Sequence, residues 1–205
     1  EIAGQPDDNA EVDVTIGAGA ASTTTTAGDL TVTGNLSVTG TDHVGITHAS
    51  IWRLTTNTEG NHTPLASNLE EDDTYGNGTI GSSMTESSGI FTFPVTGYWL
   101  VTATHKGFNA DGADDESTYV GMFLSVTTNG EAGSPTYSTA AAAFSYLPEM
   151  YTGAAASTSQ KIIDVTSTTN VKVRFEVLCE DVDAWTEGST EINTTHFTFI
   201  RLGDT

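Results

Sequence analysis

The chain has 205 residues and carries 27 Asp and Glu against 6 Lys and Arg, a formal net charge of −21. This charge excludes proteins that bind nucleic acid chiefly by neutralising phosphates, and the lack of a polybasic cluster argues against docking on anionic lipid. No apolar run approaches the roughly 18 residues of a membrane-spanning helix, so we expect no membrane insertion. With 21 Gly, many Thr and few good helix formers, the composition favours β-structure.

Residues 1–48 are predicted to form an N-terminal arm and a β-repeat stem. Residues 1–11 are polar and acidic, as is typical of a flexible arm. Residues 30–41 repeat nearly the same six-residue pattern, LTVTGN and then LSVTGT. In an extended strand, one face of this repeat is apolar or glycine and the other is small and polar. The apolar face carries four side chains: Leu30, Val32, Leu36 and Val38.

A lone ribbon of this length has nothing within itself to bury that face against. The repeat therefore predicts a stem that packs on copies of itself, through the four apolar side chains. The alternative is an ordinary hairpin edge of a single domain.

Residues 49–205 are predicted to form one head domain, in which strand-like segments alternate with turn signals. The expected strands are 49–56, 79–84, 90–95, 98–106, 118–127, 137–147, 161–166, 171–179 and 194–202. Residues 140–143 are four alanines, but their Thr, Ser and Tyr neighbours favour a strand over a helix. Since no amphipathic helix and no strand–helix–strand rhythm occurs, the prediction is an all-β chain whose head is an antiparallel jelly-roll β-sandwich.

Candidate chemical groups are few. Cys179 continues the alternating run of residues 171–177, so a buried, inert thiol is predicted, and a single cysteine allows no intrachain disulfide. The five histidines show no metal-ligand spacing: His43, His48, His62, His105 and His196. No motif of a serine hydrolase, a zinc protease or a phosphate-binding loop is present. The sequence therefore predicts a protein that is not an enzyme.

Three acidic clusters occupy residues 70–73, 111–116 and 180–183. Their carboxylates are ligands that calcium accepts, but none has the spacing of the twelve-residue calcium loop. We expect no cofactor and interpret the clusters as solvated loops, with calcium binding as the alternative.

Residues 89–103, GIFTFPVTGYWLVTA, resemble the globular head of complement's first component, in the tumour necrosis factor-like jelly-roll superfamily. There, the pattern Gly-x-Phe-x-x-Pro-x-x-Gly-x-Tyr joins two central strands. Four residues match it, and a tryptophan stands where the family has tyrosine: Gly89, Phe91, Pro94, Gly97 and Trp99. Residues 122–130, 171–177 and 196–202 resemble later family strands in the same order. The resemblance covers about residues 49–205 and implies a head that associates as a homotrimer.

The stem segment GDLTVTGNL, residues 28–36, is similar to repeats that precede the heads of bacteriophage tail fibres and other virion appendages. Stem and head together predict a structural virion protein of a tailed phage, at the surface of the particle. It would be a capsid-decorating protein or a fibre or appendage protein. The arm would contact other virion proteins, and the head would brace the capsid or bind a host-surface glycan or protein. The alternatives are a secreted bacterial adhesin or carbohydrate-binding module and, ranked lowest, a hydrolase of surface polysaccharide.

Overall fold

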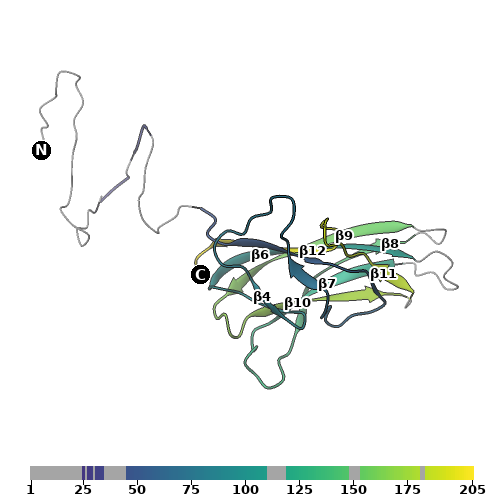
Figure 1. Cartoon of the computed structure of the whole chain (residues 1–205). Coiled ribbons are helices and arrows are strands. Elements are labelled where there is room, and N and C mark those ends of the chain that lie inside the picture. Colours follow the sequence, from purple (N-terminus) through teal and green to yellow (C-terminus); the bar gives the residue numbers. More distant parts are fainter. Residues whose placement is uncertain are drawn as a thin grey trace, which may run out of the picture. The chain divides into compact units, whose positions relative to one another are not determined.

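The computed structural model describes residues 25, 27–29, 31–34, 45–109, 119–147, 153–180 and 183–205. The chain divides into two units, Glu1–Asp42 and His43–Thr205, and each is described by itself. We call the second unit the head; it holds every strand of the described residues (Figure 1). No helix long and apolar enough to cross a membrane occurs in the described ranges.

The head is built from two antiparallel sheets that face each other (Figure 1). The seven-stranded sheet runs β2-β11-β6-β12-β1-β3, with β9 paired to β6; the five-stranded sheet runs β4-β5-β10-β7-β8. The strands are β1 (Ala49–Leu54), β2 (Thr58–Glu59), β3 (Leu69–Glu71), β4 (Thr85–Ser87), β5 (Ile90–Thr92), β6 (Gly97–Asn109), β7 (Tyr119–Thr127), β8 (Ser138–Tyr146), β9 (Ala154–Val165), β10 (Lys172–Cys179), β11 (Ala184–Thr186) and β12 (His196–Gly203). The predicted all-β class is confirmed.

Two of the predicted strands are corrected. No strand covers 79–84: Ile80 forms only an isolated bridge with Ala49, and Gly81 has φ +66°, which ends the extended backbone. β9 begins at Ala154 rather than at 161. Its first half was missed because its inward-facing side chains are serines, Ser157 and Ser159, instead of the apolar residues that mark a strand. The tetra-alanine segment lies in β8, as predicted.

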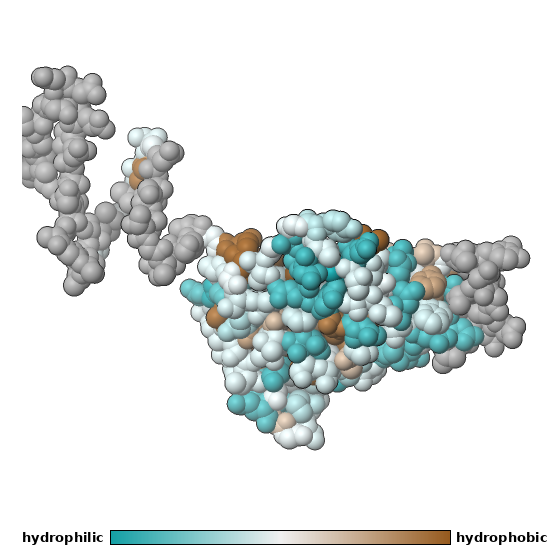
Figure 2. Space-filling model, viewed as in Figure 1, coloured by the Kyte–Doolittle hydropathy of each residue, from teal (hydrophilic) through white to brown (hydrophobic). Residues whose placement is uncertain are grey.

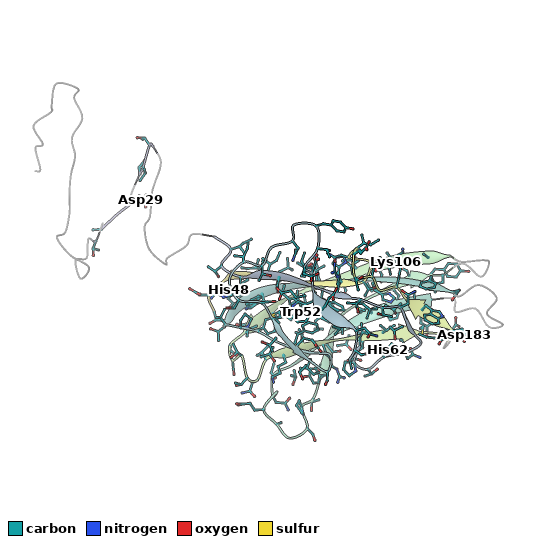
Figure 3. The ribbon with its side chains drawn as sticks, in the orientation of Figure 1. Asp29, His48, Trp52, His62, Lys106 and Asp183 are labelled. Atoms are coloured by element: carbon teal, nitrogen blue, oxygen red, sulfur yellow. The ribbon has the colours of Figure 1, made fainter. Side chains whose placement is uncertain are left out.

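The core between the sheets is aromatic. The rings of Phe175 and Phe197 stack with centroids 3.8 Å apart and an interplanar angle of 7°, which joins β10 of one sheet to β12 of the other. The ring of Trp52 meets Phe91 edge-on from β1, and Figure 3 shows Trp52 in the middle of the head. Cys179 is buried, as its place in the alternating run predicts. Burial of large apolar side chains is the main source of stability in such a sandwich.

The two sheets also meet directly along one side. Ser145 Oγ of β8 donates a hydrogen bond to the carbonyl oxygen of Ala156 in β9, 2.7 Å away. Ser157 Oγ of β9 donates one back to the carbonyl of Ala143, at 3.3 Å. This side of the sandwich is therefore closed by two serines, whose small side chains let the backbones of the two edges come close.

Candidate functional site

The outer face of the seven-stranded sheet is the first candidate site. In β6, the odd-numbered side chains from Trp99 to His105 point into the core, so the even-numbered ones from Tyr98 to Lys106 point outward. The strand register then fixes which outward side chains of β9, β12 and β1 lie beside them. This face can be read as a set of rows that cross the strands.

One row is apolar across the whole sheet. Leu100 pairs with Ile162 on one side and with Ile200 on the other, and Ala49 continues the row to Ile80. We call these residues the apolar row: Ile162, Leu100, Ile200, Ala49 and Ile80. Ile162 is 57% exposed and Ile80 is 48% exposed. An apolar strip on the face opposite the core has no packing partner within the head, and such strips mark interaction sites.

The next two rows toward Arg53 are mainly polar. The next row contains Gln160, Thr102, Thr198 and Ile51. The row after it contains Thr158, Thr104, His196 and Arg53, and the hydroxyls of Thr104 and Thr158 lie 3.1 Å apart. From the apolar row in this direction, the face thus becomes hydroxyl-bearing and then charged.

Arg53 forms the charged end of the face, and it is only 1% exposed. Its Nε donates to Glu70 at 2.8 Å, and its terminal nitrogens donate to Asp72 at 2.9 Å and Asp73 at 3.1 Å. Burial acts to raise the pKa of the Asp72 carboxyl. Hydrogen bonds from Asn193 and Thr74 and the charge of Arg53 outweigh it, so the pKa falls below its usual value.

This arrangement gives the acidic cluster at 70–73 a structural role. Three of its carboxylates compensate one buried guanidinium, as a buried charge requires. Among the described residues, no group of three or more His, Cys, Asp or Glu is arranged to hold a metal ion. The cluster at 111–116 lies outside the described residues, and so do residues 181–182 of the third cluster.

The structure spreads the described histidines over the head, and Figure 3 shows His48 and His62 in different parts of it. Ring nitrogens of three of them contact threonine hydroxyls: Thr47 for His48, Thr58 for His62 and Thr186 for His105. His105 points into the core, where burial lowers its pKa from 6.5 to about 4. His196 of β12 pairs with Thr104, the residue before His105, and therefore points to the outer face. The two rings lie on opposite faces of the sheet and do not converge.

The motif residues from the sequence lie in the core and its turns. Gly89 has φ +80°, and a Cβ there would lie 2.5 Å from the carbonyl oxygen of Leu65. Phe91 is fully buried against four other aromatic rings. Pro94 follows the end of β5, and Gly97 begins β6 with φ +139°. The buried Trp99 donates its indole N–H to the carbonyl oxygen of Val95 at 3.3 Å. The motif therefore shapes the fold and places no binding group on the surface.

Of the four predicted stem residues, only Val32 lies within the described residues, and its side chain is 43% exposed. Leu30, Leu36 and Val38 lie outside them. The packing of the stem stays a prediction.

A second apolar surface, which the sequence did not predict, lies on the outer face of the five-stranded sheet at its β8 edge. Phe144 lies over Gly121, where a Cβ would collide with the ring. The ring contacts Phe123 at 5.3 Å and Tyr119 at 5.9 Å between centroids, and Tyr146 pairs with Tyr119. We call Tyr119, Phe123, Phe144 and Tyr146 the aromatic cluster. Phe144 is 45% exposed. On the side of the head that Figure 2 shows, hydrophobic residues lie in small groups among hydrophilic ones.

Comparison with known proteins identifies the fold. Comparisons with protein-family models and with curated protein sequences find no match. Among solved structures, the chain is similar to murine APRIL at pH 5.0, with a TM-score of 0.53 and 13% identity over 76% of this chain and 99% of that one. It is also similar to the Eiger TNF of S. frugiperda, with a TM-score of 0.54 and 12% identity over 77% and 93%. The head therefore has the tumour necrosis factor-like jelly-roll fold, and the predicted fold class is confirmed.

Proposed function

We propose that the chain is a non-enzymatic structural protein of a tailed-phage virion, in which three copies form an exposed jelly-roll head. The observation that carries the assembly is the apolar row, which crosses the outer face of the seven-stranded sheet and has no partner within the head. The virion assignment is supported by the similarity of residues 28–36 to repeats of virion appendages. The protein would stand at the particle surface, as a capsid-decorating or an appendage protein.

The head presents two different apolar surfaces, and this favours a closed ring. In a cyclic assembly of more than two copies, each contact joins one surface of a subunit to a different surface of its neighbour. The apolar row crosses a sheet face, whereas the aromatic cluster lies at the β8 edge of the other sheet, so the edge of one copy can dock on the face of the next around a rotation axis. Three is the number of copies that the resemblance to the tumour necrosis factor-like superfamily implies.

Charge opposes this assembly, because three copies bring three times −21 together. Salt weakens the repulsion: the screening length falls from about 10 Å in about 0.1 M salt to about 3 Å in about 1 M salt. The apolar row itself holds no charged side chain, so its contact is not directly repulsive. We therefore expect the trimer to be tightest in saline water.

The virion role is tested on purified particles. Electron microscopy with mass-spectrometric identification of the particle proteins should find this chain at many copies per particle, in a surface feature. Absence from the virion would reject the proposed role and leave the secreted adhesin. The trimer is tested separately, by the molar mass of the chain in solution.

A further inference from the structure

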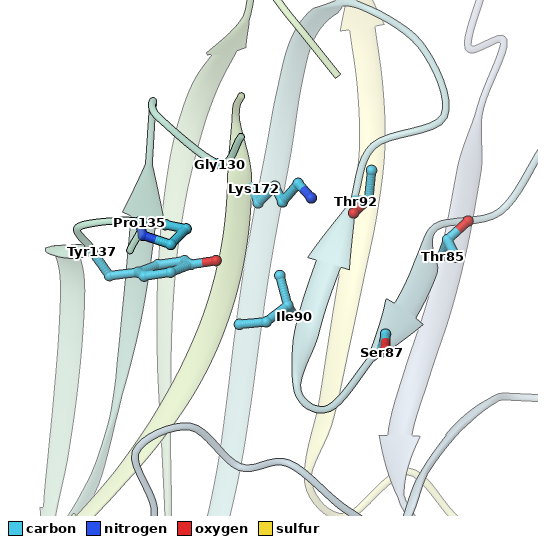
Figure 4. Close-up of a pocket in the computed structure, with 8 residues that line it drawn as sticks. All are labelled: Thr85, Ser87, Ile90, Thr92, Gly130, Pro135, Tyr137 and Lys172. Carbon is cyan, nitrogen blue, oxygen red and sulfur yellow. The ribbon is translucent and has the colours of Figure 1, made fainter. Parts of the chain in front are cut away.

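A cavity of about 300 Å³ lies on the outer face of the five-stranded sheet, at the end opposite the aromatic cluster (Figure 4). It lies between β4, β5, the start of β10 and the loop before β8. The lining residues are Thr85, Ser87, Ile90, Thr92, Gly130, Pro135, Tyr137 and Lys172. Its volume is at the lower end of the range of about 300–1,000 Å³ for small-molecule sites.

The register of the sheet places the polar groups of this cavity in one row. Thr92 pairs with Thr85 on one side and with Lys172 on the other, so two hydroxyls and an ammonium group lie side by side. The next row contains Ser87, Ile90 and Arg174. Figure 4 shows the Lys172 side chain extending toward Thr92, with Tyr137 and Pro135 forming the opposite wall. The cavity therefore has a polar floor and an apolar wall.

Lys172 is unusual in this acidic chain. Four of the six basic residues make ion pairs: Arg53, Lys106, Arg174 and Arg201. Lys161 and Lys172 make none with the described residues, and of these two only Lys172 lines this cavity. An ammonium group without a carboxylate partner, in a chain with 27 acidic residues, is available for an anion from outside.

The Tyr137 ring of this wall is held in place by Arg174. The guanidinium of Arg174 lies 4.2 Å from the centroid of the Tyr137 ring, and its Nε donates to Glu176 Oε1 at 2.8 Å. The carboxylate of Glu176 neutralises Arg174, so Arg174 orients the ring while Lys172 keeps its charge for the cavity. The ring is thus a preformed surface beside a free cation.

We propose that this cavity binds a carboxylate-bearing sugar residue. A sugar ring has an apolar C–H face, which suits Tyr137 and Ile90, and a rim of hydroxyls, which suits Thr85, Ser87 and Thr92. The sugar carboxylate would accept a charge-assisted hydrogen bond from Lys172. A phosphate group fits less well, because a single lysine supplies the charge and half of the wall is apolar. The cavity and the aromatic cluster lie at opposite ends of this outer face, so a neighbouring copy docked on the cluster leaves the cavity open.

This inference goes beyond the proposed function, because purified protein should bind the sugar whether or not the chain is part of a virion. The probes are D-glucuronic acid and D-glucose, which share a ring and differ in the carboxylate. Titration of the full chain, followed by NMR shifts of amides in β4, β5 and β10, should show saturable binding of glucuronate. Glucose should bind on the order of tenfold more weakly, as expected for the loss of a hydrogen bond between charged groups.

Two matched variants locate the site. Lys172→Met keeps most of the length of the side chain and removes its charge, so it should weaken glucuronate binding on the order of tenfold and leave glucose binding unchanged. Lys161→Met removes the other lysine without an ion pair and should change neither. Tyr137→Leu should weaken both sugars, because it removes the stacking surface.

Three results would overturn the proposal: no saturable glucuronate shifts, equal binding of the two sugars, or equal effects of the two lysine variants. Because the readout does not depend on particles or on oligomeric mass, failure here leaves the proposed function untouched.

Discussion

Leu100 of β6 and Ile162 of β9 face each other across the strand register, and both project from the outer face of the seven-stranded sheet, away from the core. Neighbouring strands contribute Ile200 and Ala49 at the same level. An antiparallel sheet with one face on the core usually presents polar side chains on the other face. This row is apolar instead, and the proposed assembly explains why.

A charge placed in the apolar row should break the trimer. Ile162→Asp would bury an unpaired carboxylate at the contact, which costs several kcal/mol. Phe144→Ser on the opposite sheet should have a similar effect, because it removes the other half of the same contact. Both variants should sediment as monomers at concentrations where the wild-type chain is a trimer.

The matched control is Thr85→Asp, which adds the same charge at an exposed position of β4, at the opposite edge of its sheet from β8 and outside both apolar surfaces. It should leave the sedimentation unchanged. If all three variants keep the wild-type mass, neither the apolar row nor the aromatic cluster is a contact.

The stem should strengthen the same trimer. Replacing both Leu36 and Val38 with Asp would place charge on the predicted apolar face, whereas Thr31→Asp with Thr33→Asp would place the same charge on the polar face. The first pair should lower the concentration-dependent thermal midpoint of the trimer more than the second pair. Equal effects of the two pairs would show that the repeat has no buried face.

Removing the buried cation should strongly destabilise the head. Arg53→Met would leave the carboxylate of Asp72, whose side chain is 8% exposed, without its main counter-charge. Loss of one partner of a buried pair costs about 3–5 kcal/mol of unfolding free energy. Lys106→Met removes the half-exposed pair with Glu187 and should cost less than about 1 kcal/mol. Urea unfolding at equal protomer concentrations measures both, and similar losses in the two variants would contradict the role given to Arg53.

Acid should destabilise the head through His105. Burial lowers the pKa of its imidazole from 6.5 to about 4, so below pH 6.5 the unfolded chain takes up a proton that the folded chain does not. The unfolding free energy should therefore be fully present above about pH 6.5 and fall as the pH drops toward 4. The expected loss from this group is about 2 kcal/mol between about pH 7.5 and about pH 5.

His105→Gln tests this assignment, because glutamine does not titrate. The variant should lose much of the pH dependence in urea unfolding and keep the part due to His48 and His196, whose pKa values are also lowered by burial. An unchanged pH dependence in the variant would reject His105 as the acid-sensitive group.

Local patterns predicted the fold well where alternation was strong. β10 was recognised because Val173, Phe175 and Val177 alternate with charged residues, and the Gly89-to-Trp99 motif identified the jelly roll. The first half of β9 was missed because its inward side chains are small and polar. β2, β3, β4 and β11 were missed because two or three residues carry no measurable periodicity.

The candidate surfaces could not be predicted in the same way. The apolar row combines residues from 49 to 200 in the sequence, and only the register of four strands puts them at one level. The role of the acidic cluster at 70–73 likewise depends on Arg53, which lies in a different strand. The sequence did hold a partial signal for the apolar row. Leu100 is an apolar residue among the outward positions of β6, and Ile162 is one among the outward positions of β9.

The most direct test of the proposed assembly is the molar mass of the full wild-type chain in solution. Light scattering coupled to size exclusion, run across a series of protein concentrations and in salt from about 0.1 M to about 1 M, gives that mass without assuming a shape. We predict three times the mass of one chain, with dissociation upon dilution occurring first at low salt. A mass of one chain at every concentration and salt would contradict the account.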